Sequence, residues 1–346
     1  MKRILLAAAA LVVLNAQADP GVRVNRVGPG AAATQAPLET DTHYDASVAA
    51  PAYRTRHPRV LFDEGHHNFH TPGTRYRPFA DLIRNDGYGI ASNPGSFTAA
   101  ALAGHDILIV VNAMGSEAVE AYWSPAFTEE ECRAVAAWVR GGGALLLIAD
   151  HAPFGIAAER LAQAFGVDMS KGVTVDPGHA DPETGNRSFI LYTRDGQGLG
   201  SHPILEGRGP EERVGRVMTF SGQSLRGPEG SSALLRLADT AIDRPPATEA
   251  EIRAAVTAAR EQAQRAGQPE PGEVRLQRPA QRISAAGRAQ AIAFRFGRGR
   301  VVVLGEAAML SAQRTTEGLL IGLNRPGLDN RRFALNVMHW LSGLLD

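Results

Sequence analysis

The sequence predicts an α/β fold built around a mostly parallel, doubly wound sheet. Two apolar runs of strand length, DILIVVNA at 106–113 and ALLLIAD at 144–150, are nearly continuous, as expected of strands covered on both faces. Between them lies a helical pattern that begins at a capping box of Thr128 and Glu131 and ends at glycines 141–143. Strand and helix patterns alternate through the first half, which predicts parallel strands joined by right-handed crossovers.

The other elements follow from the same patterns. Up to residue 165, strands are predicted at 59–63, 88–91, 106–113 and 144–150, and helices at 76–85, from Thr128 to Gly141, and at 157–165. The second half is irregular and richer in β-structure, with strands predicted at 188–194, 216–220, 233–238, 289–296 and 299–304, and a helix at 333–345. The Gly-x-Gly of FGRGRVV, residues 296–302, precedes a strand, so it predicts a hairpin turn and not a dinucleotide-binding loop.

The N-terminal 18 residues have the features of a secretory signal peptide. A basic start at Lys2-Arg3 precedes an apolar stretch from Ile4 to Leu14, and Ala16-Gln17-Ala18 has the small-x-small pattern of a cleavage site. The apolar stretch is much shorter than the roughly 20 residues that span a bilayer. We therefore expect an exported protein, periplasmic or secreted, with no transmembrane segment after cleavage.

The rest of the chain divides by composition. Residues 19–56, rich in Ala, Pro, Gly and Thr, are expected to form a linker or extended arm, and residues 57–346 an α/β domain with a polar helical insertion near 245–280. The single cysteine, Cys132, excludes an internal disulfide. The formal net charge is zero, so there is no basic excess to favour nucleic acid as a partner.

Ionisable residues follow several predicted strands, where open α/β sheets bind their ligands. The first strand leads into DEGHHNFH at 63–70, the strand at 144–150 leads into Asp150-His151, and the strand at 299–304 leads to Glu306. Because the carboxyl ends of parallel strands share one edge of a sheet, we expect these side chains to converge. The candidate catalytic residues are Asp150, His151 and Glu306; the candidate substrate-binding residues are Asn68, His70, Asn112 and Ser221; and the candidate metal ligands are Asp63, Glu64, His66 and His67.

The residue types leave three kinds of chemistry to compare. Imidazole and carboxylate groups suit a divalent metal such as zinc, although the stretch lacks the His-Glu-x-x-His pattern of helical zinc sites. Alternatively, a histidine such as His151 beside carboxylates could serve in acid–base catalysis. A purely structural polar loop, in which Asp63 caps a turn and His66 or His67 bonds the backbone, is the third interpretation. Covalent catalysis has little support, because no Gly-x-Ser-x-Gly or Gly-x-Cys-x-Gly elbow occurs and Ser221 is only a weak nucleophile candidate.

Four longer stretches suggest a family. AWVRGGGALLLIADH at 137–151, SHPILEG at 201–207, GRVVVLGEAAML at 299–310 and NRRFALNVMHWLSG at 330–343 resemble the class I glutamine-amidotransferase-like superfamily. Within it, the likeness is to the trehalose-utilisation-protein-like and uncharacterised gliding-motility-type branches, and it covers roughly residues 58–346 apart from the polar insertion. The resemblance implies a flavodoxin-like layered sheet.

The resemblance also implies what the protein does not do. Where true glutamine amidotransferases place a nucleophilic cysteine, this chain has Asp150-His151, so glutaminase activity is not expected. His151 matches a histidine that commonly ends this strand in the trehalose-utilisation-like branch, which suggests a small-molecule or carbohydrate-related ligand. Two functions follow as expectations: an exported hydrolase or lyase, with or without a metal, and a non-catalytic envelope module that binds a glycan or a partner.

Overall fold

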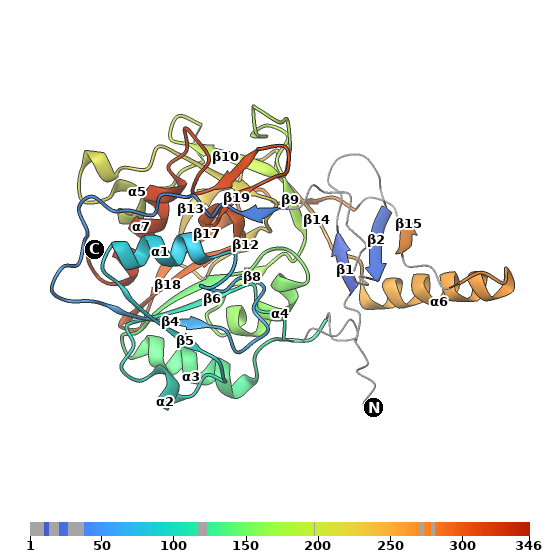
Figure 1. The fold of residues 1–346 in the computed structure, drawn as a ribbon, viewed down its shortest axis with the longest axis horizontal. Helices are drawn as coiled ribbons and strands as arrows, with labels where there is room; N and C mark the ends of the chain where they lie inside the picture. The colour runs from blue at the N-terminus through green and yellow to red at the C-terminus, as the bar shows by residue number, and fades with distance from the viewer. Residues whose placement is uncertain are drawn as a thin grey trace.

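The computed structural model describes residues 10–13, 21–26, 38–115, 123–196, 198–269, 273–277 and 281–346. At its centre is a nine-stranded sheet with the order β5-β4-β6-β7-β18-β17-β12-β8, in which β13 also pairs with β17 (Figure 1). Its strands are β4 (Arg59–Asp63), β5 (Gly89–Asn93), β6 (Ile107–Val111), β7 (Ala144–Ile148), β8 (Asp168–Met169), β12 (Leu225–Arg226), β13 (Ser232–Arg236), β17 (Ala289–Phe296) and β18 (Gly299–Leu304).

The first five strands of this order run parallel to one another, and the rest of the sheet is antiparallel. β4 pairs in parallel with β5 and β6, and β7 pairs in parallel with β6 and β18. β17 and β18 form an antiparallel hairpin, as FGRGRVV predicts. Gly297 turns this hairpin with a φ of 60°, and a Cβ there would lie 2.7 Å from the carbonyl oxygen of Arg140, so glycine is required.

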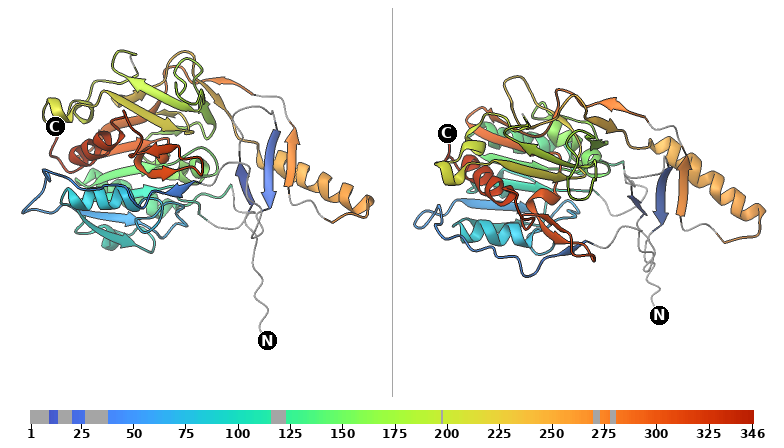
Figure 2. Two further views of the ribbon diagram at one scale, coloured as in Figure 1. Left: turned by 45° about the horizontal axis from the view of Figure 1, so that its top comes forward. Right: turned by 90° about the horizontal axis from the view of Figure 1, so that it is seen from above.

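Helices cover both faces of the parallel half, which confirms the doubly wound α/β prediction (Figure 2). α1 (Arg77–Asn85) and α7 (Asn330–Leu341) pack on one face, and α2 (Ala99–Leu102), α3 (Glu129–Arg140) and α4 (Phe154–Gln163) pack on the other. Successive residues of each central strand belong alternately to the two cores, and all are buried. This explains the nearly continuous apolar runs in the sequence.

The predicted β-rich second half forms smaller sheets beside the main one. The hairpin of β10 (Phe189–Thr193) and β11 (Arg216–Phe220) packs into the core on the α7 face. Two three-stranded sheets adjoin it, and they consist of β9 (Val173–Val175), β14 (Ile242–Arg244) and β16 (Ile283–Ser284), and of β3 (Glu39–Thr40), β19 (Ala312–Arg314) and β20 (Leu320–Gly322). Short turns of helix, α5 (Pro203–Glu206), η2 (Pro210–Glu212) and η3 (Ala308–Leu310), connect these strands.

α7 ties the end of the chain to its beginning. The buried His339 donates from Nε2 to Asp86 Oδ2 at 2.6 Å, just beyond the end of α1. Ser342, the residue after α7, accepts a hydrogen bond from the hydroxyl of Tyr53 at 2.8 Å. Residues 38–56, the described part of the predicted linker or arm, thus lie against α7, and Arg331 donates to the carbonyl oxygen of Asp45 at 2.6 Å.

The polar insertion contains α6 (Glu249–Arg265), which extends away from the rest of the protein (Figure 1). Beside it, β15 (Glu273–Gln277) pairs with β2 (Gly21–Arg26), which in turn pairs with β1 (Ala10–Val13). Of the predicted signal peptide, only β1 is described, and the other residues up to 18 lie outside the described part of the chain.

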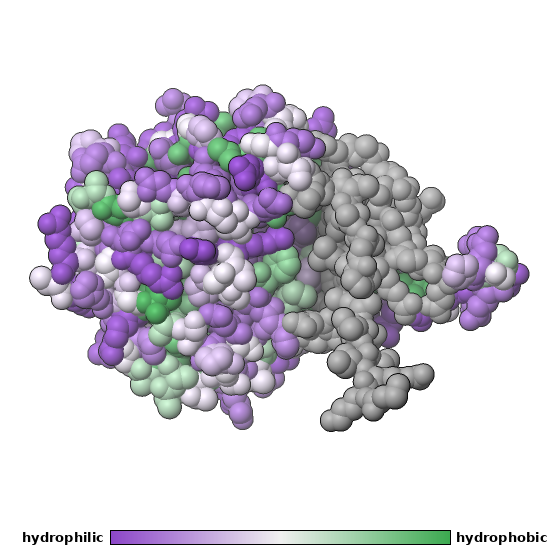
Figure 3. Space-filling view, in the orientation of Figure 1, coloured by the Kyte–Doolittle hydropathy of each residue, from purple (hydrophilic) through white to green (hydrophobic). Residues whose placement is uncertain are grey.

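Most of the visible surface is polar. The face seen in Figure 3 is mainly hydrophilic, with apolar residues only in small, separate patches. Among the large hydrophobic side chains that the structure describes, only Phe69 and Ile283 are exposed, at 39% and 55%. None of the described helices has both the length and the apolar character needed to cross a membrane.

Candidate functional site

Adjacent strands of the parallel half deliver polar side chains to one edge of the sheet. Asp63 ends β4, Asn112 follows β6, Asp150 follows β7 and Glu306 follows β18. The central pair is held by two hydrogen bonds: Asn112 Nδ2 donates to Asp150 Oδ2 at 2.7 Å, and the Asp150 amide donates to Asn112 Oδ1 at 2.9 Å. The expected convergence of residues that follow β6, β7 and β18 is therefore present.

The carboxyl groups of Asp150 and Glu306 bind three consecutive backbone amides. Ala307 N–H donates to Asp150 Oδ1 at 2.6 Å. Ala308 N–H donates to Glu306 Oε1 at 2.6 Å, and Met309 N–H donates to Glu306 Oε2 at 2.8 Å. These amides begin the short η3 helix, so a single turn of backbone positions both carboxyl groups.

The two carboxyl groups raise each other's affinity for protons. Glu306 is only 1% exposed, and burial together with the negative charge of Asp150 raises its pKa to about 8, although backbone amides oppose the shift. Burial also raises the pKa of Asp150, against the opposing effects of the His151 charge, Asn112 and the Ala307 amide. Glu306 therefore retains a proton near neutral pH, next to a second carboxyl group.

His70 and Tyr76 complete the buried side of this cluster. Asn112 Nδ2 also donates to His70 Nδ1 at 3.1 Å, so the neutral His70 ring carries its proton on Nε2. Burial and the nearby charge of Arg75 lower the pKa of His70 to about 3, which keeps the ring neutral. Tyr76 donates from its hydroxyl to the carbonyl oxygen of Ala307 at 2.6 Å.

Asn112 and Ser221 hold strained backbone conformations at this edge. Asn112 has a φ of 43° and is fully buried, and Ser221, directly after β11, has a φ of 75°. Left-handed conformations are uncommon for residues other than glycine and concentrate at functional sites. Ser221 Oγ lies 2.7 Å from Ser188 Oγ. The next residue, Gly222, lies against Glu306, since a Cβ on Gly222 would be 2.6 Å from Glu306 Cβ.

His151 does not join the hydrogen bonds of the cluster. Its Nδ1 lies 2.9 Å from the carbonyl oxygen of the neighbouring Ala152, so the ring is fixed to its own loop. The residue is half-buried and close enough for its charge to act on Asp150. The prediction that His151 lies near Asp150 at the strand end thus agrees with the structure, while its catalytic role stays a prediction.

The candidate metal ligands are arranged differently from the prediction. Asp63 is fully buried and binds His66 Nδ1 through both oxygens, at 2.8 and 3.0 Å, while His66 Nε2 binds Glu131 Oε1 at 2.9 Å. The ring lies between Phe97 and Phe127, with centroids 4.6 and 4.7 Å away. With both nitrogens directed at carboxylates, His66 is an imidazolium that has no lone pair for a metal.

The charges around His66 favour the same protonation state. Burial disfavours the charged ring, but the hydrogen bonds and negative charges of Asp63 and Glu131 outweigh it and raise the pKa of His66 above 6.5. Burial of Glu131 is likewise outweighed, because Thr128, His66 and the Phe97 amide donate to its carboxylate and lower its pKa to about 2. The arrangement Asp63–His66–Glu131 is therefore a buried ion cluster, named here the His66 cluster.

The remaining residues of the loop fasten it or face outward. Asn68 donates to Asp63 Oδ2 at 3.0 Å and to the carbonyl oxygen of Val111 at 3.2 Å. Glu64 is exposed and accepts a hydrogen bond from Ser92, and His67 is exposed with a φ of 50°. Across the described ranges, no three His, Cys, Asp or Glu side chains are grouped so that they could hold a metal ion. The proposed ligand set Asp63, Glu64, His66 and His67 does not fit a metal.

Sequence reasoning missed two members of these clusters. Glu131 was recognised only as the second half of the capping box, which is present: Thr128 Oγ1 accepts from the Glu131 amide at 3.2 Å. Its second role as a partner of His66 depends on tertiary packing across 65 residues of sequence. Tyr76 stands at the start of a predicted helix, and nothing in its local pattern indicates a contact 231 residues away.

Comparisons with known proteins concern the fold. No family model matches the chain, and no curated protein matches its sequence. Among solved structures, the N-terminal domain of mmIFT52 is similar at 14% identity and a TM-score of 0.54, over 82% of this chain and 97% of that one. A ThuA-like protein from Bacteroides uniformis, at 10% identity and 0.38, covers 86% of this chain and 95% of its own. A protein assigned as a GMP synthase subunit from Thermoplasma acidophilum, also at 10% and 0.38, covers 84% and 97%. The chain thus shares its layered α/β fold with the first of these domains.

Proposed function

We propose that the protein is an exported hydrolase whose active site is the carboxyl pair Asp150 and Glu306 at the strand ends. The observation that supports this most directly is the pair itself: two carboxyl groups on three consecutive amides, one of which keeps its proton up to about pH 8. Paired carboxyl groups with unequal protonation are the usual apparatus for moving protons at neutral pH.

Asp150 is the member of the pair that would touch the substrate. It is part-exposed, as are its neighbours His151 and Ser221, whereas Glu306 lies behind it with 1% exposure. In this scheme Asp150 takes a proton from water, which attacks the substrate, and then returns the proton to the leaving group. Glu306 holds the adjacent proton and so keeps the proton affinity of Asp150 high enough for both steps.

The surrounding side chains would bind and orient the substrate. Asn112 fixes Asp150 through two hydrogen bonds and aligns His70, which directs Nε2–H away from Asn112. Ser221 offers a hydroxyl next to Gly222 and Glu306. The resemblance of the motifs to the trehalose-utilisation-like branch favours a small carbohydrate-related substrate for this site.

The test is a turnover screen with nitrophenyl glycosides and nitrophenyl esters. We expect Asp150→Asn to lose about 10²–10⁴-fold in rate on any substrate that is cleaved, because a positioned acid–base group contributes that much. Glu306→Gln should change the pH profile, and the exposed Glu64→Gln is the matched control that keeps full activity. Cleavage at the wild-type rate by Asp150→Asn would refute the assignment.

A non-catalytic binding module is the second candidate. It is favoured by the fact that every carboxyl oxygen of Asp150 and Glu306 already accepts a hydrogen bond from the protein, which is also how buried caps are satisfied. Under this alternative, glycan binding is lost in Asp150→Asn although no substrate of the screen is cleaved.

Export is proposed from the sequence of residues 1–18. Expression in a bacterium, followed by fractionation and N-terminal sequencing, tests it. We expect the mature protein outside the cytoplasm with Asp19 as its first residue. Recovery in the cytoplasm with residues 1–18 still attached would contradict the proposal.

A further inference from the structure

A cavity of about 260 Å³ lies among the smaller sheets, away from the Asp150–Glu306 pair. Three segments form its wall: the loop after β9, the strand β10 with the turn that follows it, and the residues at the end of β13. Its volume is just below the roughly 300–1,000 Å³ of sites that hold drug-sized ligands, so it suits a molecule of a few carbon atoms.

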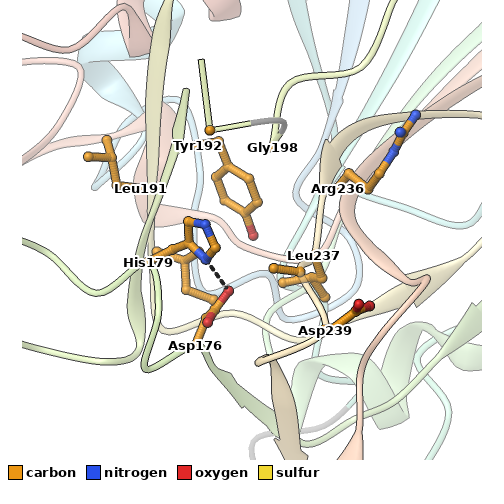
Figure 4. Close-up of a pocket in the computed structure, with 11 residues that line it drawn as sticks. Asp176, His179, Leu191, Tyr192, Gly198, Arg236, Leu237 and Asp239 are labelled. Carbon is orange, nitrogen blue, oxygen red and sulfur yellow. Dashed lines mark hydrogen bonds and ion pairs between the residues drawn. The ribbon is translucent and has the colours of Figure 1, made fainter. Parts of the chain in front are cut away.

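One wall carries an aspartate–histidine pair that the sequence analysis did not identify (Figure 4). Asp176 is 1% exposed, and its Oδ1 accepts hydrogen bonds from Thr240 Oγ1 at 2.5 Å and from the Gly178 amide at 3.0 Å. Its Oδ2 lies 2.9 Å from His179 Nδ1. A carboxylate held from one side by two donors can only accept from His179, so Nδ1 carries the proton and Nε2 offers a lone pair.

His179 presents that lone pair to the cavity. Its side chain is 34% exposed, and Nε2 has no hydrogen-bond partner among the residues that the structure describes. The neighbouring Tyr192 is not a competing group, since its buried hydroxyl already donates to Gln290 Oε1 at 2.8 Å. His179 is thus the acceptor that a ligand hydroxyl would meet on this wall.

The opposite wall is charged at its rim and apolar within. Figure 4 shows Arg236 and Asp239 across the cavity from His179, with Leu237 between them. Arg236 and Asp239 are exposed, and neither side chain has an ion-pair partner in the described part of the chain. Arg236 can bind a carboxylate, whereas Asp239 beside it would repel a second negative group and accept from a hydroxyl.

We propose that this cavity is a second ligand site that binds a small hydroxy acid with one carboxylate. Arg236 binds the carboxylate, and His179 Nε2, oriented by Asp176, accepts from a hydroxyl. The short carbon skeleton packs against Leu237 and the ring of Tyr192, while Gly196 and Gly198 leave the third side without bulk. This site does not depend on the proposed hydrolase activity.

Calorimetric titration of the full-length protein with three matched probes tests the assignment. Glycerate carries both groups, propionate lacks the hydroxyls and glycerol lacks the carboxylate. We expect glycerate to bind in about the millimolar range and each of the other probes at least about tenfold more weakly, because each loses one polar contact. A lack of saturable glycerate binding, or equal binding of propionate, overturns the proposal.

Two variants examine the pair itself. In Asp176→Asn, the side-chain oxygen can still accept from Thr240 and Gly178, but the amide now donates to Nδ1, so the proton moves to Nε2 and the acceptor is lost. We expect Asp176→Asn and His179→Gln each to weaken glycerate about tenfold or more, and the ¹⁵N shifts of His179 to report the tautomer change in Asp176→Asn. His43→Gln, at an exposed histidine near Asp41, is the matched control and should bind like the wild type. Unchanged affinity in His179→Gln would also overturn the proposal.

Discussion

The His66 cluster makes a prediction that separates a structural histidine from a metal ligand or a catalytic one. His66→Ala leaves Asp63 and Glu131 with no cationic partner, and their side chains are only 0% and 8% exposed. Removing one member of a buried ion pair costs about 3–5 kcal/mol, because the remaining charge is left without compensation. Since domains of this kind unfold with about 5–15 kcal/mol in total, His66→Ala should be folded but severely destabilised.

Urea denaturation followed by circular dichroism and tryptophan fluorescence measures this loss. Glu64→Gln, two positions away and exposed, is the matched control and should change the free energy of unfolding by less than about 0.5 kcal/mol. A loss below about 1 kcal/mol in His66→Ala would refute the interpretation of the cluster as a structural element.

The pH dependence of the same difference supplies a second check. The pKa of His66 is raised in the folded state, so its contribution is complete below 6.5 and is lost as the pH rises through the folded value. The pKa of Glu131 is lowered from 4.5 to about 2, so its contribution is complete above 4.5 and is lost as the pH falls toward 2. The stability gap between wild type and His66→Ala should therefore be widest between pH 4.5 and 6.5.

Three further predictions concern other parts of the molecule. Because the pKa of Glu306 is raised from 4.5 to about 8, the wild type should lose stability as the pH rises from 4.5 to 8, and urea unfolding of Glu306→Gln should show a smaller pH dependence over that range; equal slopes would contradict the shift. Thr128→Ala should cost about 1–2 kcal/mol of global stability in urea, more than Thr248→Ala, whose similar capping box begins the projecting helix α6. Gly222→Ala should lower the melting temperature strongly, since its Cβ would lie 2.4 Å from the Gly305 carbonyl oxygen, whereas Gly73→Ala, with open space around it, should leave the melting temperature nearly unchanged.

Periodicity and capping were sufficient to predict the main sheet. β4, β11, β17 and β18 have the bounds expected from their apolar runs, and α3 begins at the expected capping box. Helix ends were less accurate: α4 begins at Phe154, one turn before the expected start, and α7 ends at Leu341 because Gly343 adopts a φ of 78°. The two- and three-residue strands of the second half were missed, since such short segments show no period.

The candidate site was predictable only as far as strand order determines it. Asn112, Asp150 and Glu306 meet because they follow adjacent parallel strands, and that rule requires no side-chain detail. The direction in which His66 points depends on Glu131 and on two phenylalanines from other elements, which no local pattern records. His179 was overlooked because Asp-Pro-Gly-His looks like an ordinary turn, and the role of its Asp176 depends on Thr240.

The contact between α7 and the region after α1 also sets the order in which the protein can be completed. Asp86 and His339 are 253 residues apart, so at about 5–20 residues per second the ribosome needs on the order of 10–50 s to produce the second after the first. During that time the face of the sheet that α7 later covers, which includes Leu146 and Val302, lacks its final helix. Any factor that acts on the growing chain therefore meets an open apolar layer, and the burial of Asp86 with its histidine is among the last steps of folding.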